Sequence, residues 1–359
     1  MKQNKVLITG GHAGTTALAT IEEIHSQKAF DEVVWIGNKK AFEHNNAKTL
    51  EAKVFADLDV SFYEVDSGRL QRKWTPQTIT ALAKVPIGFI HAFRIVSRER
   101  PDIVLSFGGA ISVSVAISAW ILGIPIVVHE QTIAVGLANK IVSFFAEKIA
   151  LARVESKVHF NSHKCVHIGN PISKNLRNIV RKEPKGRPVL FITGGSRGAK
   201  TINEVIFQSI DTLTKKYTVI HQTGDTDIEH AKEINNPHYQ SFAFIHPREL
   251  KTILENVHIM IARAGANTVA EVIAFSIPTI FIPIPWVRYN EQNKNAQLAR
   301  RAHIAEIIDQ DSFDTDTLSE TLQKVENNYS TYTTKELTTT SKDLNAHKNL
   351  VRLLLEITQ

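Results

Sequence analysis

Short apolar runs alternate along the first half of the chain with longer segments of mixed polarity. The runs are rich in Val, Ile and Phe. They are VLIT at 6–9, EVVWIG at 32–37, VSFYEV at 60–65, DIVLSFG at 102–108, IPIVVHE at 124–130 and KIALA at 148–152. Strands that are apolar on both faces and separated by helix-length segments predict a parallel sheet covered by helices on both sides.

The same pattern starts again after a polar, basic, proline-containing stretch, SKNLRNIVRKEPKGRP. The runs of the second half are VLFITGG at 189–195, YTVIHQTG at 217–224, FAFI at 242–245, VHIMIARAG at 257–265 and IPTIFIP at 277–283. We therefore predict an α/β protein with two doubly wound, Rossmann-like domains facing a central cleft, where open α/β sheets bind ligands. The predicted parts are a domain at 1–172, a linker at 173–186, a domain at 187–338 and a closing amphipathic helix at 339–359.

One uncharged stretch of eighteen residues, 111–128, is close to the length of a membrane span. Gly123 and Pro125 divide it, so we expect a buried helix followed by a strand.

The N-terminus, MKQNKVLITGGH, has no apolar signal region, and the single Cys165 leaves no internal disulfide. With 43% hydrophobic and 22% charged residues, the composition excludes disordered, collagen-like and coiled-coil chains. These features favour a protein of the reducing cytoplasm.

The net charge of +6 is concentrated in one segment. Seven basic residues and one acid, Glu99, lie between 69 and 100: the bases are Arg69, Arg72, Lys73, Lys84, Arg94, Arg98 and Arg100. Such a patch suits an anionic surface of lipid head groups or polyphosphate, and we expect no nucleic-acid partner. A helical projection places Leu82, Val85, Phe89, Phe93 and Val96 opposite Lys84, His91, Arg94 and Arg98. The alternative is that the apolar stripe is core and the basic face is merely solvated.

Three glycine-rich turns each follow an apolar strand and precede a helix: TGGHAGTT at 9–16, SFGGAIS at 106–112 and TGGSRGAKT at 193–201. Glycine lets backbone N–H groups approach an anion, although strand-to-helix turns also favour glycine for steric reasons. Thr9 stands where the dinucleotide fingerprint needs a glycine, and Ala199 stands where the P-loop needs one. NAD and a P-loop ATPase are therefore disfavoured.

A fourth turn, ARAGANTVAEV from 262, leads into another helix. Glu271 lies about one and a half turns into that helix, where a carboxylate could accept both hydroxyls of a ribose while the helix start holds phosphates. The alternative is that Glu271 is an ordinary solvated helix residue.

Taken together, the motifs resemble the peptidoglycan N-acetylglucosaminyltransferases of glycosyltransferase family 28, almost from end to end. The matching motifs are GGH at 10–12, SGRLQRK at 67–73, PDIVLSFGGAIS at 101–112, GIPIVVHEQTIAVGLANK at 123–140, GNP at 169–171, TGGSRGA at 193–199, HQTG at 221–224, RAGANTVAE at 263–271 and NEQNKNA at 290–296. The resemblance implies the GT-B fold and transfer of N-acetylglucosamine from UDP-N-acetylglucosamine to an undecaprenyl-linked muramyl-pentapeptide. It also implies a peripheral protein at the cytoplasmic face of the cell membrane.

The resemblance also implies roles for individual residues. His12 and Glu130 are the candidate catalytic residues. The implied donor-binding residues are Ser196, Arg197, Gly198, Ala264, Gly265, Glu271, Glu291, Gln292 and Asn295. The acceptor and diphosphate loops would contain Gly11, Gly108, Gly109, Gln131 and Thr132. No metal site and no cofactor are expected, because loop and helix dipoles would hold the diphosphate.

The sequence departs from the family pattern on several of these loops. Thr132 stands where Asn is common, Ala110 where Tyr is common and Ser173 where Arg is common, while Glu291 replaces His or Gln. These changes preserve the UDP-sugar interpretation and leave other acceptors open. The remaining alternatives are a GT-B transferase with a different lipid or glycan acceptor, a non-hydrolysing UDP-sugar epimerase and a non-catalytic UDP-sugar-binding protein.

Overall fold

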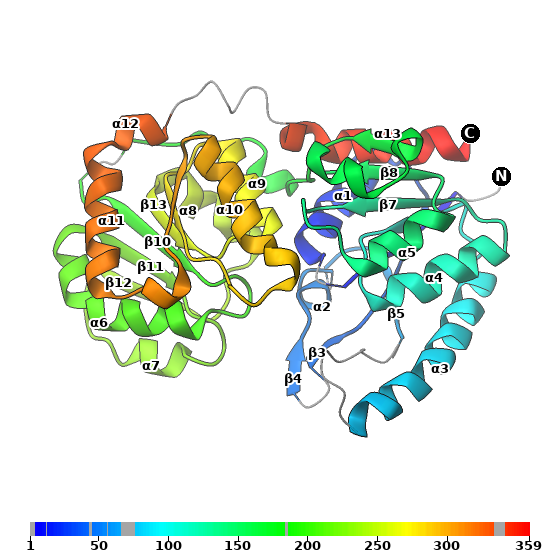
Figure 1. The fold of residues 1–359 in the computed structure, drawn as a ribbon, viewed down its shortest axis with the longest axis horizontal. Helices are drawn as coiled ribbons and strands as arrows, with labels where there is room; N and C mark the ends of the chain where they lie inside the picture. The colour runs from blue at the N-terminus through cyan, green and yellow to red at the C-terminus, as the bar shows by residue number, and fades with distance from the viewer. Residues whose placement is uncertain are drawn as a thin grey trace. The chain divides into compact units, whose positions relative to one another are not determined.

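The computed structural model describes residues 4–11, 13–42, 45–55, 57–65, 76–183, 186–333 and 342–359. The chain forms two compact units (Figure 1). The first unit comprises Met1–Lys174 and Lys342–Gln359, and the second comprises Asn175–Ser341. The sequence analysis placed the corresponding divisions after residue 172 and before residue 339.

The first unit is built on a parallel sheet of seven strands in the order β5-β2-β1-β6-β7-β8-β9. The strands are β1 (Lys5–Thr9), β2 (Glu32–Gly37), β5 (Ser61–Glu64), β6 (Ile103–Ser106), β7 (Ile126–Glu130), β8 (Lys148–Leu151) and β9 (Cys165–His167). A small antiparallel hairpin, β3 (Lys40–Phe42) and β4 (Asn45–Lys48), lies outside this sheet. The six apolar runs are confirmed as strands, whereas β9 and the hairpin were not predicted.

Helices cover both faces of this sheet, as strand alternation requires (Figure 1). Val6 and Ile8 of β1 belong to a core that includes residues of α1 (Gly14–Gln27) and the C-terminal helix. Leu7 points the other way, into a core that includes residues of the three further helices of this unit. These are α3 (Pro76–Glu99), α4 (Ala110–Ile121) and α5 (Leu137–Phe145), and a short helix α2 (Leu50–Val54) packs beside α1.

The uncharged stretch 111–128 forms most of α4 and the start of β7, as predicted. Among the described residues, no helix combines the length and apolarity needed to span a membrane. Helix α3 runs through Pro86, and its side chains are described from residue 86 onward. Val96 is buried in the core, while Phe89 and Phe93 are half-buried and stack on each other. The expected apolar stripe is therefore partly core.

The second unit has a parallel sheet of six strands in the order β12-β11-β10-β13-β14-β15. The strands are β10 (Val189–Thr193), β11 (Thr218–Gln222), β12 (Tyr239–Phe242), β13 (Val257–Ala262), β14 (Thr279–Phe281) and β15 (Ala305–Ile307). The helices are α6 (Lys200–Lys216), α7 (Ile228–Lys232), α8 (Pro247–Asn256), α9 (Ala266–Phe275), α10 (Glu291–Arg301), α11 (Thr315–Asn327) and α12 (Tyr329–Tyr332). The α/β fold class with two Rossmann-like sheets is confirmed.

The strand prediction at 242–245 was wrong, because the strand lies at Tyr239–Phe242. Tyr239 is buried against the core of the second unit, whereas the Ile245 amide donates to the Gln222 side chain instead of to a neighbouring strand. The residues of the predicted linker from 175 onward belong to the second unit. Arg181, for example, donates to the carbonyls of Val257 and Ser276.

The C-terminal helix, α13 (Ala346–Thr358), packs against α1 in the first unit and buries Leu350 and Leu354 there. The segment leading into it is fixed by Asp343, whose carboxylate accepts both terminal guanidinium nitrogens of Arg153 at 2.8 and 3.0 Å and the Asn170 amide at 2.7 Å. Of the helix predicted at 339–359, the structure shows an α-helix at Ala346–Thr358, and this helix completes the first unit.

Candidate active site

Two glycine loops of the first unit meet at the carboxyl edge of its sheet. The Gly11 amide donates to the Gly108 carbonyl at 2.9 Å. Gly109 has φ +93°, and a Cβ on it would lie 2.8 Å from the Gly11 nitrogen, so only glycine allows this approach. The candidate acceptor residues Gly11, Gly108 and Gly109 therefore lie together. His12 lies outside the described residues, and its catalytic role stays a prediction.

Glu130, the other candidate catalytic residue, is buried at the end of β7. Its Oε1 accepts the amide and the hydroxyl of Thr132, both at 3.0 Å, and its Oε2 accepts Asn139 Nδ2 at 2.9 Å. Burial raises the pKa of the Glu130 carboxyl. These bonds hold the loop between β7 and α5 in place. That Glu130 is the catalytic base stays a prediction, and the geometry favours a positioning role.

The neighbours of Glu130 also tie this loop to the rest of the unit. His129 is fully buried, and its Nε2 lies 3.0 Å from the Gly169 carbonyl, so Nε2 carries the proton and donates it. Burial lowers the pKa of His129 to about 4, so the ring is neutral at neutral pH. Gln131 Oε1 accepts the Thr16 hydroxyl at 3.1 Å, which connects the loop to α1. Thr132, whose amide and hydroxyl donate to Glu130, is buried as well.

In the second unit, the TGGSRGA loop packs against the HQTG turn. Gly198 has φ +73°, and a Cβ there would lie 1.8 Å from the Thr223 carbonyl oxygen. The Gln222 side chain donates to the Gly195 carbonyl at 2.7 Å and accepts the Ile245 amide at 2.9 Å. Ser196 and Gly198 are half-buried and Arg197 is exposed on this loop. The loop is held in shape by the neighbouring turn, and the Ser196 side chain lies at its partly exposed tip.

A buried network of polar side chains holds the HQTG turn to α6 and β12. Asn203 of α6 donates to the Thr223 carbonyl at 2.8 Å and accepts from His221 Nε2 at 3.1 Å. The Nδ1 atom of His221 then accepts the Tyr239 hydroxyl at 3.0 Å. Burial lowers the pKa of His221 to about 3, consistent with a neutral ring that fixes one tautomer. Sequence reasoning missed Asn203, although the HQTG motif pointed to His221.

The other candidate donor residues lie on α9, α10 and the turn before α9. Ala264 is buried and Gly265 is the N-cap of α9, where no side chain caps the helix. Asn295 of α10 donates to the Ala264 carbonyl at 3.3 Å, and Gln292 accepts the Ile284 amide at 3.0 Å. Glu291 and Gln292, both half-buried, start α10. The structure thus joins the Ala264 turn directly to the helix that contains Gln292.

Glu271 lies on α9, and burial raises the pKa of its carboxyl to about 7. None of the described residues donates a hydrogen bond to this carboxylate. Glu271 is half-buried, and a desolvated carboxyl without donors is destabilised in its ionised form. A ligand that supplies hydroxyl donors would therefore relieve an existing cost.

Arg263 is a buried cation beside this site that sequence reasoning did not assign. Its guanidinium donates to the Ile282 carbonyl at 2.8 Å and to Gln310 Oε1 at 2.7 Å, and both acceptors are uncharged. Burial lowers the pKa of Arg263 to about 10, so it remains charged at neutral pH. The charge, one residue before Ala264, makes the start of α9 favourable for an anion.

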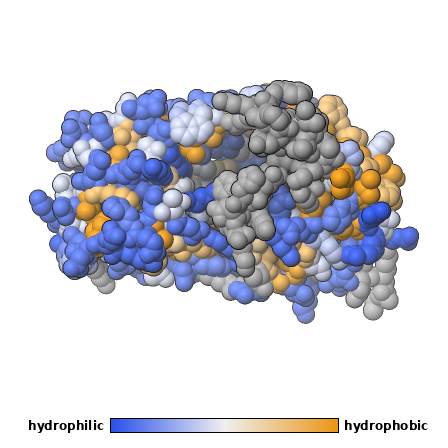
Figure 2. All heavy atoms as spheres, turned by 90° about the horizontal axis from the view of Figure 1, so that it is seen from below, coloured by the Kyte–Doolittle hydropathy of each residue, from blue (hydrophilic) through white to orange (hydrophobic). Residues whose placement is uncertain are grey.

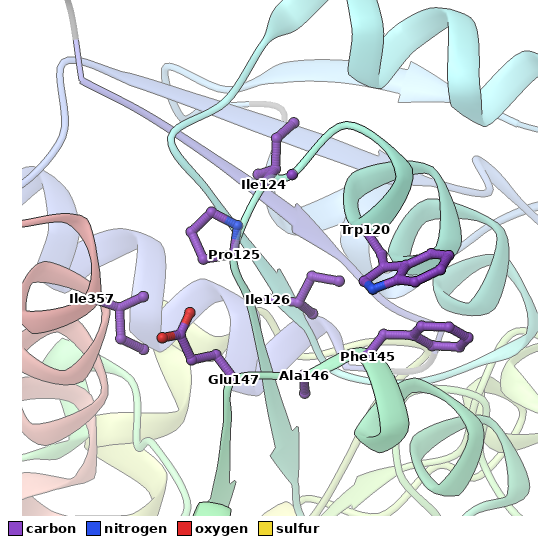
Figure 3. Close-up of a pocket in the computed structure, with 9 residues that line it drawn as sticks. Trp120, Ile124, Pro125, Ile126, Phe145, Ala146, Glu147 and Ile357 are labelled. Carbon is purple, nitrogen blue, oxygen red and sulfur yellow. The ribbon is translucent and has the colours of Figure 1, made fainter.

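A groove of about 460 Å³ in the first unit lies away from these loops (Figure 3). Trp120 and Phe145 lie side by side at one end, and Glu147 and Ile357 lie at the other. The groove contains residues 124–126, at the amino end of β7, whereas the glycine loops follow carboxyl ends. It is therefore not part of the candidate active site.

Metal binding was not expected from the sequence. Within the described ranges, His, Cys, Asp and Glu side chains form no group of three or more that could hold a metal ion. The expectation of no tightly bound metal stays a prediction.

The fold and these loops define a two-domain α/β protein with the features of a nucleotide-sugar enzyme. Residues 189–351 match the glycosyltransferase family 28 C-terminal domain and residues 6–151 match the glycosyltransferase family 28 N-terminal domain. The chain belongs to glycosyltransferase family 28.

A curated relative from Shouchella clausii, a UDP-N-acetylglucosamine--N-acetylmuramyl-(pentapeptide) pyrophosphoryl-undecaprenol N-acetylglucosamine transferase, is 30% identical over 91% of this chain and 92% of its own length. Among solved structures, Acinetobacter baumannii MurG is similar with a TM-score of 0.68 and 21% identity, covering 98% of this chain and 99% of that one. A UDP-GlcNAc 2-epimerase from Neisseria meningitidis also has a TM-score of 0.68, at 12% identity, over 98% of this chain and 100% of that one. At these identities, the structural neighbours establish the fold.

Proposed function

We propose that this protein transfers N-acetylglucosamine, with inversion, from UDP-N-acetylglucosamine to an undecaprenyl-linked muramyl-pentapeptide in peptidoglycan synthesis. Curated relatives of this name match the chain over nearly its full length. The proposal rests on the groups that lie at the carboxyl edge of the sheet in the second unit. There α9 presents an N-terminus without a side-chain cap and contains Glu271, whose carboxyl accepts no hydrogen bond from the described residues. The Asn295–Ala264 hydrogen bond joins the turn before α9 to the helix that contains Gln292.

Each part of the donor has a matching group on this edge. Glu271 would accept the ribose hydroxyls, and the amides at the start of α9, next to the Arg263 charge, would bind the diphosphate. Gln292 and Asn295 would contact the sugar. Positive electrostatics at the diphosphate stabilise the charge that develops as UDP leaves. The same groups favour diphosphate binding without a tightly held metal.

The acceptor hydroxyl must attack the anomeric carbon from the face opposite UDP and must lose a proton to a base. The loops with Gly11, Gly108, Gly109, Gln131 and Thr132 would bind the acceptor. His12 is the candidate base, because Glu130 is committed to the bonds that fix its own loop. A His12→Ala variant should therefore lose turnover while retaining affinity for UDP-N-acetylglucosamine.

Turnover with purified lipid acceptor tests the proposal. We expect UDP release and a glycosylated lipid product that both depend on the acceptor. Sugar isomerisation without acceptor would instead indicate an epimerase, the activity of the Neisseria meningitidis protein. Donor binding without any UDP release would indicate a non-catalytic UDP-sugar-binding protein, and turnover only with another lipid or glycan would identify a different acceptor.

We also propose that the first unit docks on the anionic cytoplasmic face of the membrane through a surface formed by Ile87, Ile90, Arg94, Arg98, Trp120 and Ile121, here called the docking surface. Ile87 is 65% exposed and Trp120 58% exposed, and Arg94 and Arg98 are also exposed. Figure 2 shows apolar residues gathered with hydrophilic ones on the side where Figure 1 has α3 and α4. The predicted basic residues Arg69, Arg72 and Lys73 lie outside the described residues.

Vesicle sedimentation tests this docking. Each basic residue near anionic lipid contributes about 1 kcal/mol, so binding should rise with anionic lipid and fall with salt. Charge reversal at Arg69, Arg72, Lys73, Arg94 and Arg98 should abolish binding without changing UDP affinity. Reversals at Lys215 and Lys232 in the second unit are the control. Binding that ignores salt, or no binding at all, would contradict the proposal.

A further inference from the structure

Two large aromatic side chains on the turn between β14 and α10 are more than half exposed. Trp286 is 64% exposed and Tyr289 is 51% exposed. The turn directly precedes Glu291 and Gln292, the start of the helix assigned to the donor sugar. Large aromatic surfaces left in water forgo the stabilisation of burial.

The backbone of this turn is strained. Tyr289 has φ 56° and ψ 22°, and Asn290 has φ 54° and ψ 40°, so two consecutive residues other than glycine are left-handed. Asn tolerates this conformation, but the Cβ of a tyrosine makes it costly. Strain of this kind persists where surrounding contacts fix the chain, and it is concentrated at ligand-binding sites.

Hydrogen bonds hold both ends of the turn to the donor edge. On one side, the Ile284 amide donates to Gln292 at 3.0 Å, so the chain just before Trp286 is tied to α10. On the other side, Asn295 of α10 donates to the Ala264 carbonyl. Strand β14, which leads into the turn, pairs with β13, which leads into the Ala264 turn. The aromatic rings are thus attached to the same sheet edge as the candidate donor residues.

We propose that Trp286 and Tyr289 bind the pyranose ring of the nucleotide-linked N-acetylhexosamine, an inference that rests on the function proposed above. One face of a hexopyranose presents C–H groups, and a flat aromatic ring covers that face while leaving the hydroxyls free for Gln292. Trp and Tyr supply this contact area with only two side-chain torsions to fix. A turn fixed in advance lowers the ordering cost of binding further.

Calorimetry with UDP and with UDP-N-acetylglucosamine separates the sugar contact from the nucleotide contact. For Trp286→Ala and Tyr289→Ala, we expect affinity for UDP-N-acetylglucosamine to fall about two- to tenfold each, while affinity for UDP stays unchanged. Tyr289→Phe keeps the ring and should bind like the wild type. Asn290→Gly relieves strain but keeps both rings, so it is the control for a general effect of the turn.

Tryptophan emission gives a second readout that does not depend on activity. UDP-N-acetylglucosamine should change the emission of the wild type, UDP should change it less, and Trp286→Phe should remove the difference. Equal losses for UDP and UDP-N-acetylglucosamine in the alanine variants would overturn the proposal, as would unchanged affinity for both. An effect confined to the Michaelis constant of the lipid acceptor would also overturn it. If the wild type itself failed to bind UDP-N-acetylglucosamine, the proposed function would fail first.

Discussion

Donor affinity should depend on pH through Glu271. Desolvation by the surrounding protein raises the pKa of its carboxyl to about 7, and no described residue donates a hydrogen bond to it. Ribose hydroxyls that donate to the carboxylate stabilise its charged form, so the pKa must fall when the donor binds. The bound state therefore holds fewer protons, and affinity rises with pH until Glu271 is ionised in both states.

The expected size follows from the ionised fraction. With a pKa of about 7, roughly nine-tenths of the carboxyls are ionised at pH 8 and about one-tenth at pH 6, so affinity should fall about tenfold over this interval. Each unit of pKa shift corresponds to about 1.36 kcal/mol. UDP-N-acetylglucosamine is the appropriate ligand, because the terminal phosphate of free UDP titrates near pH 6 and would obscure the effect.

Calorimetry at pH 6 in buffers of different ionisation enthalpy measures the protons released, and we expect close to one per donor bound. Glu271→Gln should give a weak and pH-independent affinity, and Glu271→Ala should bind about ten- to a hundredfold more weakly at pH 8. A wild-type affinity that is flat from pH 6 to pH 8, with no proton release, would refute the assignment of Glu271 to the ribose.

Three further outcomes are expected. Asp343→Ala should lower the free energy of unfolding of the first unit by about 3 kcal/mol in urea titrations, because it leaves the Arg153 charge buried and unpaired; an unchanged midpoint would show that the pair contributes nothing. Gly198→Ala should weaken UDP binding and stability together, since its Cβ would overlap the Thr223 carbonyl, whereas Gly136→Ala, with φ −69° and open space, should alter neither. Turnover should survive dialysis against EDTA, because backbone amides next to the Arg263 charge would hold the diphosphate; recovery only after added Mg²⁺ would contradict this.

The pattern of apolar residues was enough to predict the two parallel sheets, because parallel strands buried on both faces have predominantly apolar sequences. It failed at β12, where Tyr239 is buried while the more apolar FAFI run continues into a loop. Short edge strands such as β9 and β15 contain too few apolar residues to stand out from their surroundings. Their pairing is decided by neighbours that are distant in the sequence.

The candidate site was predicted where a motif marks a backbone requirement. Gly109 and Gly198 are such positions, since each has a positive φ and a neighbour that excludes a side chain. The sequence could not show that Glu130 is bridged to Asn139, or that no described carboxylate pairs with the buried Arg263. These facts depend on which side chains meet in space. His12 remains a prediction from the motif alone.

The return of the C-terminal helix to the first unit makes the second unit an insertion within the first. Both chain ends belong to the first unit, and Leu350 and Leu354 contribute to its core. On the ribosome, the second unit can therefore finish folding before the first, because the first must wait for α13 to be synthesised. Tandem domains usually fold in the order of their synthesis, the N-terminal domain first. Here the unit that begins the chain would be the last to complete its fold. Until α13 is synthesised, the face of the first sheet that it covers remains open.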